Sequence, residues 1–221
     1  MPPPRPLLFD LDGTLVDTVP FILTCARHAF EGYGRPVTDA EWITGIGTPL
    51  RTQLASLALH PDDVEPLLAR YRTFWLENHD RLTHPFPGAV ELVHSLAERG
   101  HPIAIVTSKT IAGAQRTLEH VGLPELVETL IAADSCPRSK PDPMPVHVAL
   151  ERLGCTSSTA RSVMIGDSPH DVAAGKAAGT IAVAALWGAC TRDALAAANP
   201  DHFLGEIGEL PVLLRVIDAA N

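Results

Sequence analysis

The sequence predicts an α/β fold, a doubly wound (Rossmann-like) parallel sheet with a small all-helical domain inserted into it. Short apolar runs recur along the chain, and stretches of helical length with apolar residues at three-to-four spacing lie between them. This alternation of strand and helix is typical of a parallel sheet covered by helices on both faces. The insertion is predicted because about 80 residues separate the first apolar run from Pro87-Gly88, far more than one crossover helix needs.

Strands are expected where short apolar runs end in polar or acidic residues, as buried parallel strands do. The runs cover residues 7–9, 102–106, 130–132, 162–165 and 181–184. Between them, apolar positions such as Ala89, Leu92, Val93 and Leu96 have the spacing of a helix face. A glycine follows each helical stretch, at the position where a left-handed residue ends a helix; these are Gly100, Gly122, Gly154 and Gly179.

The inserted segment also has a helical pattern, over residues 19–30, 39–43, 50–59 and 62–82. We therefore expect a helical cap domain of residues 17–84 on a core domain of residues 1–16 and 85–221. Its joints are expected at Asp17-Thr18 and at residues 84–88, where prolines and a glycine indicate a tight exit. Asp17 is expected to cap the first helix of the insertion.

Composition narrows the class of protein. The chain has 221 residues, of which 46% are hydrophobic and 19% charged, which excludes a disordered chain. The formal charge of -9 has the wrong sign for binding nucleic acid. The longest apolar stretch, residues 180–190, is too short for a bilayer span, and the proline-rich start, residues 1–6, lacks the pattern of a signal peptide. We expect a cytoplasmic protein with neither nucleic acid nor membrane as a partner.

The four cysteines, Cys25, Cys136, Cys155 and Cys190, are isolated and lack C-x-x-C spacing. They therefore predict reduced thiols, not a zinc site or a disulfide framework. The sequence leaves a monomer and a small homo-oligomer open.

Chemistry-bearing residues follow four of the strands. Ligands of such sheets bind beyond the carboxyl ends of the strands, and these residues are expected to converge there: Asp10, Asp12, Gly13, Thr14, Thr107, Ser108, Lys109, Lys140, Asp167 and Asp171. Carboxylates gathered at one point resist joint ionisation unless a cation offsets them. Oxygen ligands without His or Cys select a hard ion such as Mg²⁺. The pattern predicts a magnesium-dependent phosphoryl site.

The motifs Asp10-x-Asp12-Gly13-Thr14-Leu15, Thr107, Lys140 and Gly166-Asp167-Ser168-x-x-Asp171 resemble those of the haloacid dehalogenase-like (HAD) hydrolase superfamily, in the same order. The resemblance spans nearly the whole chain. Within the superfamily the chain is similar to the phosphoglycolate phosphatase and pyrophosphatase PpaX-like branch. This narrower match rests on Ile46-Gly47-Thr48-Pro49-Leu50, Tyr71-Arg72-Thr73-Phe74, His79-Asp80 and His170-Asp171.

The resemblance implies a Mg²⁺-dependent phosphatase that acts through an aspartyl-phosphate. Asp10 would be the nucleophile, and Asp12 the general acid and base. Mg²⁺ would be held by Asp10, the backbone carbonyl of Asp12 and Asp167, with Asp171 orienting Lys140 or a metal-bound water.

Thr107 and Lys140 would bind the phosphoryl oxygens. Further phosphate or substrate contacts would come from Gly13, Thr14, Ser108, Lys109 and, in the cap, Arg51. For Arg51 a solvated helix charge is the alternative, and for His170 the choice lies between helix surface and substrate contact.

The substrate class implied is a small phosphorylated metabolite, with 2-phosphoglycolate first and pyrophosphate next. A sugar-phosphate mutase of the same superfamily is a further alternative. From a different class, a phospho-acceptor signalling domain also combines paired acids, Thr and Lys on a parallel sheet. The acidic pair on the first strand and the long helical insertion argue against that class.

Overall fold

The computed structural model describes residues 4–123 and 126–219, and within them six parallel strands form one sheet in the order β5-β4-β1-β6-β7-β8. The strands are β1 (Leu7–Phe9), β4 (Ile103–Val106), β5 (Thr129–Ile131), β6 (Val163–Gly166), β7 (Ile181–Ala185) and β8 (His202–Leu204). The predicted doubly wound α/β fold is confirmed. The first three residues of the expected core domain, with part of the proline-rich start, lie outside the described residues, as do 124–125 and 220–221.

Helices cover both faces of the sheet, and the alternation of side chains along β1 shows how. Leu7 and Phe9 belong to an apolar cluster with α5 (Ala89–Glu98), α6 (Ile111–His120) and α10 (Leu210–Ala219). Leu8 points the other way, into a cluster with α7 (Met144–Arg152) and α8 (Pro169–Ala178). All three side chains are buried. This two-sided burial explains why β1 reads as an unbroken apolar run.

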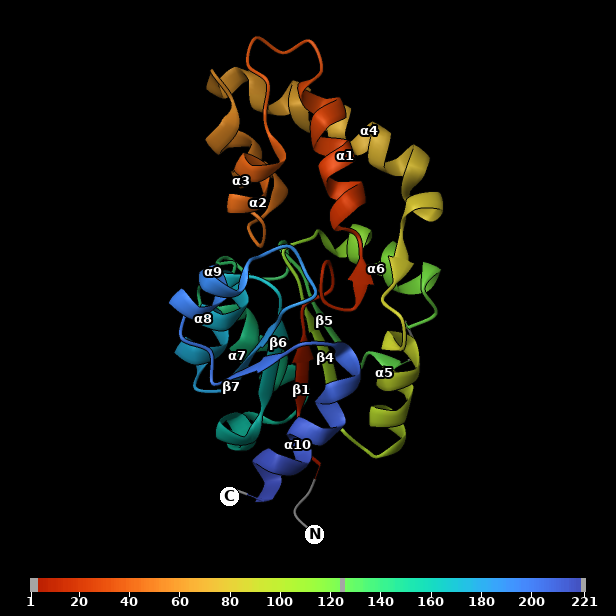
Figure 1. The fold of residues 1–221 in the computed structure, drawn as a ribbon, viewed down its shortest axis with the longest axis vertical. Coiled ribbons are helices and arrows are strands. Elements are labelled where there is room, and N and C mark those ends of the chain that lie inside the picture. Colours follow the sequence, from red (N-terminus) through yellow and green to blue (C-terminus); the bar gives the residue numbers. More distant parts are fainter. Residues whose placement is uncertain (1–3, 124–125, 220–221) are drawn as a thin grey trace.

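The inserted helices pack around an apolar cluster of their own. They are α1 (Val19–Phe30), α2 (Asp39–Thr44), α3 (Leu50–Leu57) and α4 (Val64–Leu82), with a 3₁₀ turn at Pro61–Asp63 before α4. Trp42 and Tyr71 stack with ring centroids 5.8 Å apart, in a cluster that also contains Phe21, Cys25 and Leu67. Figure 1 shows these helices as a separate layer above the carboxyl ends of the strands. We refer to α1–α4 as the cap.

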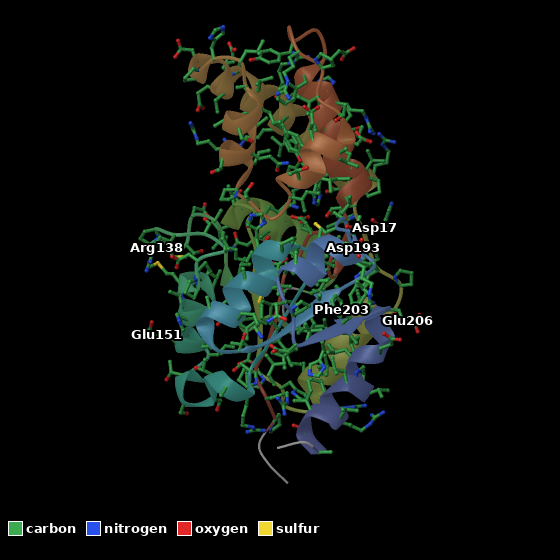
Figure 2. The ribbon with its side chains drawn as sticks, turned by 60° about the vertical axis from the view of Figure 1, so that its left-hand side comes forward. Asp17, Arg138, Glu151, Asp193, Phe203 and Glu206 are labelled. Carbon is green, nitrogen blue, oxygen red and sulfur yellow. The ribbon has the colours of Figure 1, made fainter. Side chains whose placement is uncertain are left out.

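The two connections to the cap run side by side as a two-stranded antiparallel ribbon, β2 (Val16–Asp17) and β3 (His84–Pro85). Asp17 was expected to cap α1, and this expectation is wrong. Its backbone pairs with His84, which keeps Asp17 extended and exposed at the junction (Figure 2), and Thr18 occupies the position before the helix. The Thr18 hydroxyl does not cap the helix either, because it donates to Asp12 at 2.7 Å.

The described part of the chain also contains two short 3₁₀ helices, Thr156–Arg161 and Ile207–Glu209, and two elements near the far edge of the sheet. The edge strand β8 was not predicted, and α9 (Arg192–Ala197) lies between β7 and β8 in sequence. None of the helices within residues 4–123 and 126–219 has the length and apolarity that a membrane crossing requires.

Candidate active site

The first catalytic candidate stands where β1 ends. Asp10 follows Phe9 directly, and its backbone N–H still donates to the Ile165 carbonyl of β6 at 2.9 Å. Its side chain is therefore held at the carboxyl edge of the sheet and is only 5% exposed. The chain then turns sharply at Gly13, whose φ of +80° is a left-handed conformation that favours glycine. A Cβ at Gly13 would lie 2.4 Å from Oδ2 of Asp167, so the turn also leaves room for the neighbouring acid.

Three carboxyl groups meet at this edge. Asp10, Asp167 and Asp171 each offer an oxygen within 4.8 Å of the others, and all three side chains are buried. Asp167 follows β6, and Asp171 lies in the first turn of α8. Residues more than 150 positions apart in sequence are thereby brought to one point, as the carboxyl-end rule for parallel sheets predicts.

Lys140 lies within the same cluster and is 3% exposed. Its Nζ lies 3.0 Å from Oδ1 of Asp10 and 2.5 Å from Oδ1 of Asp171, and it also donates to the Val106 carbonyl at 2.8 Å. Burial acts to lower the pKa of Lys140, but the Asp10 and Asp171 carboxylates outweigh it and raise that pKa above its usual value. The two carboxylates therefore favour the ammonium form of Lys140.

One ammonium does not balance three carboxylates. Burial raises the pKa of Asp10 well above its usual value, against the lowering effect of Lys140, and the other acids raise it further. Burial and the Asp171 carboxylate raise the pKa of Asp167 to about 7. Oδ1 of Asp10 is buried and has no assigned hydrogen-bond donor within residues 4–123 and 126–219, although Nζ of Lys140 lies 3.0 Å away as an ion pair. An all-oxygen donor set with surplus negative charge and an unbonded oxygen fits a divalent hard cation such as Mg²⁺.

Asp167 is fixed by groups on both sides. Its Oδ1 accepts from the Thr14 hydroxyl at 3.0 Å and its Oδ2 from the Ala189 N–H at 2.9 Å. Gly188 lies so close that a Cβ there would be 2.2 Å from the Cβ of Asp167. Thr14, assigned to phosphate by the resemblance, thus has its hydroxyl on Asp167.

The Gly188 and Ala189 contacts were not predicted from the sequence. These two residues follow β7, so the rule that sites form beyond strand ends was the available signal.

Asp171 makes two kinds of contact. Its Oδ2 accepts from the backbone N–H of Ser168 at 3.0 Å and from the Ser168 hydroxyl at 2.6 Å, which forms the capping box of α8. Its Oδ1 faces Lys140. Because both oxygens have donors, Asp171 is suited to orienting Lys140, the role that the resemblance implies.

Asp12 stands apart from this cluster, at the floor of a cavity of about 500 Å³ between cap and core. Its carboxylate accepts from the Thr18 hydroxyl at 2.7 Å and from Nζ of Lys109 at 2.7 and 3.0 Å. Asp10 and Thr107 line the same cavity. The first acidic pair therefore faces one space, with Asp10 at the buried cluster and Asp12 nearer the cap.

The remaining candidates lie where cap and core meet. The Ser108 hydroxyl donates to the Gly47 carbonyl at 2.5 Å, and Nδ1 of His170 lies 3.1 Å from the Ile46 carbonyl. Both side chains thus contact the cap loop of residues 45–49. Arg51 lines the cavity, but its guanidinium pairs with Glu65 on α4, and both side chains are more than half exposed.

Comparison with known proteins agrees with this geometry. The family model described as haloacid dehalogenase-like hydrolase matches residues 7–185. The chain belongs to the haloacid dehalogenase-like hydrolase family. It is 34% identical over 205 residues to pyrophosphatase PpaX from Bacillus velezensis, covering 92% of this chain and 93% of that protein. It is 35% identical over 209 residues to pyrophosphatase PpaX from Halalkalibacterium halodurans, covering 92% and 94%.

Among solved structures, a predicted phosphoglycolate phosphatase from Haemophilus somnus superposes with a TM-score of 0.85 at 23% identity, covering 95% of this chain and 97% of that one. At this identity the superposition shows that the two chains share a fold. The family model and the two PpaX relatives confirm the family resemblance inferred from the motifs.

Proposed function

We propose that this HAD-family chain is a Mg²⁺-dependent phosphatase that hydrolyses a small phosphorylated metabolite through an aspartyl-phosphate on Asp10. One observation carries the proposal. Asp10 presents a buried carboxylate oxygen with no hydrogen-bond donor in the described part of the chain, beside Lys140 and Asp167, and it lines a cavity large enough for a substrate. A carboxylate held in this way is a positioned nucleophile.

The reaction has two steps. In the first, an oxygen of Asp10 bonds to phosphorus, the bond between phosphorus and the leaving oxygen breaks, and Asp12 gives that oxygen a proton. In the second, Asp12 takes a proton from water, the water oxygen bonds to phosphorus, and phosphate leaves with Asp10 restored. The contacts of Asp12 with Lys109 and Thr18 place its carboxylate in the same cavity as Asp10.

Lys140 and Thr107 stabilise the phosphoryl oxygens. Lys140 is already oriented by Asp171 and by the Val106 carbonyl, so little reorganisation is needed when charge develops on the phosphoryl group. Mg²⁺ would be held by Asp10, the carbonyl of Asp12 and Asp167, and it would supply charge neutralisation and polarise the phosphoryl group. The Thr14 and Ala189 donors on Asp167 keep that carboxylate oriented.

Two substrates are tested first. 2-Phosphoglycolate is the phosphomonoester that the sequence motifs favour. Pyrophosphate is the second candidate, because two relatives of at least 34% identity over more than nine-tenths of the chain are named pyrophosphatase PpaX. Arg72 on α4 lines the cavity, and it makes no hydrogen bond or ion pair within the described residues. It could meet the carboxylate of the first substrate or the second phosphoryl group of the other.

The test is phosphate release from both substrates, measured as kcat/KM with and without Mg²⁺, for the wild type and for Asp10→Asn. We expect turnover that requires Mg²⁺ and falls by at least about 10³-fold in the variant, since the nucleophile is lost. Circular dichroism of the variant checks that the fold is retained. Undiminished turnover by Asp10→Asn, or release that ignores Mg²⁺ removal, would contradict the proposal.

A further inference from the structure

The cavity above Asp10 is larger and more apolar than a small anion needs. Its volume is about 500 Å³, within the range of pockets that bind organic molecules. The core contributes Asp10 and Asp12 to the lining, and the cap side contributes, beside polar residues such as Gln53 and Arg72, a set of apolar side chains on α1, on the 45–50 segment and on α4. These are Val19, Ile22, Ile46, Leu50, Trp75 and Leu76.

The cap loop is in contact with the core while this cavity is present. Ser108 donates to the Gly47 carbonyl, and His170 lies at hydrogen-bond distance from the Ile46 carbonyl. The cavity therefore has this volume while the loop of residues 45–49 is in contact with the core. The cavity lies between the cap and the core, and Asp10 lines it.

Most of the cations that line this cavity are already paired within the described part of the chain. Lys109 pairs with Asp12, Arg51 with Glu65, and Arg116 with Asp80. Arg72 alone among the lysines and arginines on the cavity wall has no such partner there. A leaving group that carries several negative charges would meet few free cations and much apolar surface.

Leu76 is the residue that most directly indicates an apolar ligand group in the cavity. It is a large apolar side chain on the cavity wall, yet it is 54% exposed. Packing inside the cap does not account for its position, because it lies outside the apolar cluster of the cap. An apolar group placed in the cavity would cover Leu76 and remove its surface from water.

We propose that the cavity binds the leaving group of an organic phosphomonoester with an apolar body about the size of an aromatic ring. This inference rests on the proposed phosphatase function and specifies its substrate class. The phosphoryl group lies at Asp10, and the alcohol lies against the cap until its bond to phosphorus breaks and Asp12 protonates it. Its apolar surface then contributes to binding in proportion to the area buried.

The first experiment compares kcat/KM for 2-phenylethyl phosphate and ethyl phosphate in the presence of Mg²⁺. Both release a primary alcohol, so the chemistry of bond cleavage is matched and the ring is the main difference. We expect the phenylethyl ester to be favoured about tenfold or more, from the apolar area of the ring. We also expect it to exceed 2-phosphoglycolate and pyrophosphate in kcat/KM.

The second experiment locates the effect with matched variants. Leu76→Ser removes an apolar side chain from the cavity wall, and Leu59→Ser removes an equally exposed one, 53% against 54%, from a position outside the cavity lining. We expect the ratio of kcat/KM for the two esters to fall about fivefold in Leu76→Ser, from partial loss of apolar contact. The ratio should stay at its wild-type value in Leu59→Ser.

The outcomes separate this inference from the proposed function. If the wild type hydrolyses 2-phenylethyl phosphate and ethyl phosphate with equal kcat/KM, or prefers 2-phosphoglycolate or pyrophosphate, the inference is overturned. The proposed phosphatase function is unaffected by either result. An equal fall of the ratio in both leucine variants overturns the assignment of the ring to the cavity. Failure to release phosphate from any of the four compounds overturns the proposed function itself.

Discussion

At the scale of single residues, the site depends on close approaches that leave no room for extra atoms. Asp167 lies between Gly13 and Gly188, and a Cβ at either glycine would come within 2.5 Å of its side chain. Gly13 also needs its left-handed φ, whereas Gly188 lacks a positive φ and its constraint is one of space alone. Gly188 is therefore the better probe of how the Asp167 carboxylate is held.

We expect Gly188→Ala to displace the Asp167 carboxylate and to raise the Mg²⁺ concentration for half-maximal activity about tenfold or more, as loss of groups that orient a metal ligand does. The measurement is a Mg²⁺ titration of phosphate release. Gly208→Ala is the matched control, because a Cβ at Gly208 meets nothing within 4 Å. If the two variants need the same Mg²⁺ concentration for half-maximal activity, the segment around Gly188 does not position Asp167 as a metal ligand.

Prediction from the sequence succeeded best for residues directly after buried strands. Asp10 and Asp167 each follow an apolar run, and the parallel topology then brings them together. The partners of these residues were harder to predict. The pairing of Lys109 with Asp12 and the contact of Ala189 with Asp167 depend on loop conformation, which no periodicity encodes.

At the scale of elements, strand and helix positions followed from apolar runs, but the shortest pieces did not. β8 is three residues long, and two of them, His202 and Phe203, are only partly buried, so its apolar pattern is weak. The ribbon β2–β3 has two residues in each strand, too few to show an alternation. The prediction that Asp17 caps a helix was wrong because Asp17 pairs with His84, which is far away in sequence, and so short a strand gives no pattern that reveals the pairing.

The end of α4 is joined to α6 through a buried histidine. His79 is fully buried, with Nε2 3.0 Å from the Thr117 hydroxyl and Nδ1 2.7 Å from the Asp80 carboxylate. Asp80 pairs in turn with Arg116 on α6. Burial lowers the pKa of His79, and the positive charge of Lys109 adds to this, although its hydrogen bond to Asp80 acts in the opposite direction.

This lowered pKa predicts a loss of stability in acid. The unfolded chain binds a proton at His79 near pH 6.5, whereas the folded chain resists it. The stabilising contribution is therefore present above about pH 6.5 and is lost as the pH falls through the folded-state pKa, with a slope of at most about 1.4 kcal/mol per pH unit for one proton.

Urea unfolding from pH 7.5 to 5 measures this loss. We expect the free energy of unfolding to fall less steeply in His79→Gln than in the wild type. His94→Gln, at an exposed position of α5, should follow the wild type. If the free energy of unfolding falls equally steeply with pH in all three proteins, His79 is not the group responsible for the loss of stability in acid.

At the scale of the whole molecule, the cap and the sheet have separate apolar clusters. The cap has its own cluster around Trp42, the sheet has others on both faces, and the candidate acids Asp10 and Asp12 line the cavity between cap and core. Chain length and helical periodicity predict an inserted helical domain, and its bounds as a domain stay a prediction. The sequence did not predict the cavity, whose volume and apolar wall depend on how the cap is seated on the core.

The central claim joins these scales: the fold holds Asp10 so that it bonds to phosphorus. The most direct measurement quenches the enzyme in acid during turnover of its best substrate with Mg²⁺, reduces any acyl phosphate with borohydride, and sequences the peptides by mass spectrometry. We predict homoserine at position 10, formed by reduction of phosphorylated Asp10, in the wild type and not without substrate. Turnover with unmodified Asp10, or with the modification at another carboxylate, would contradict the account.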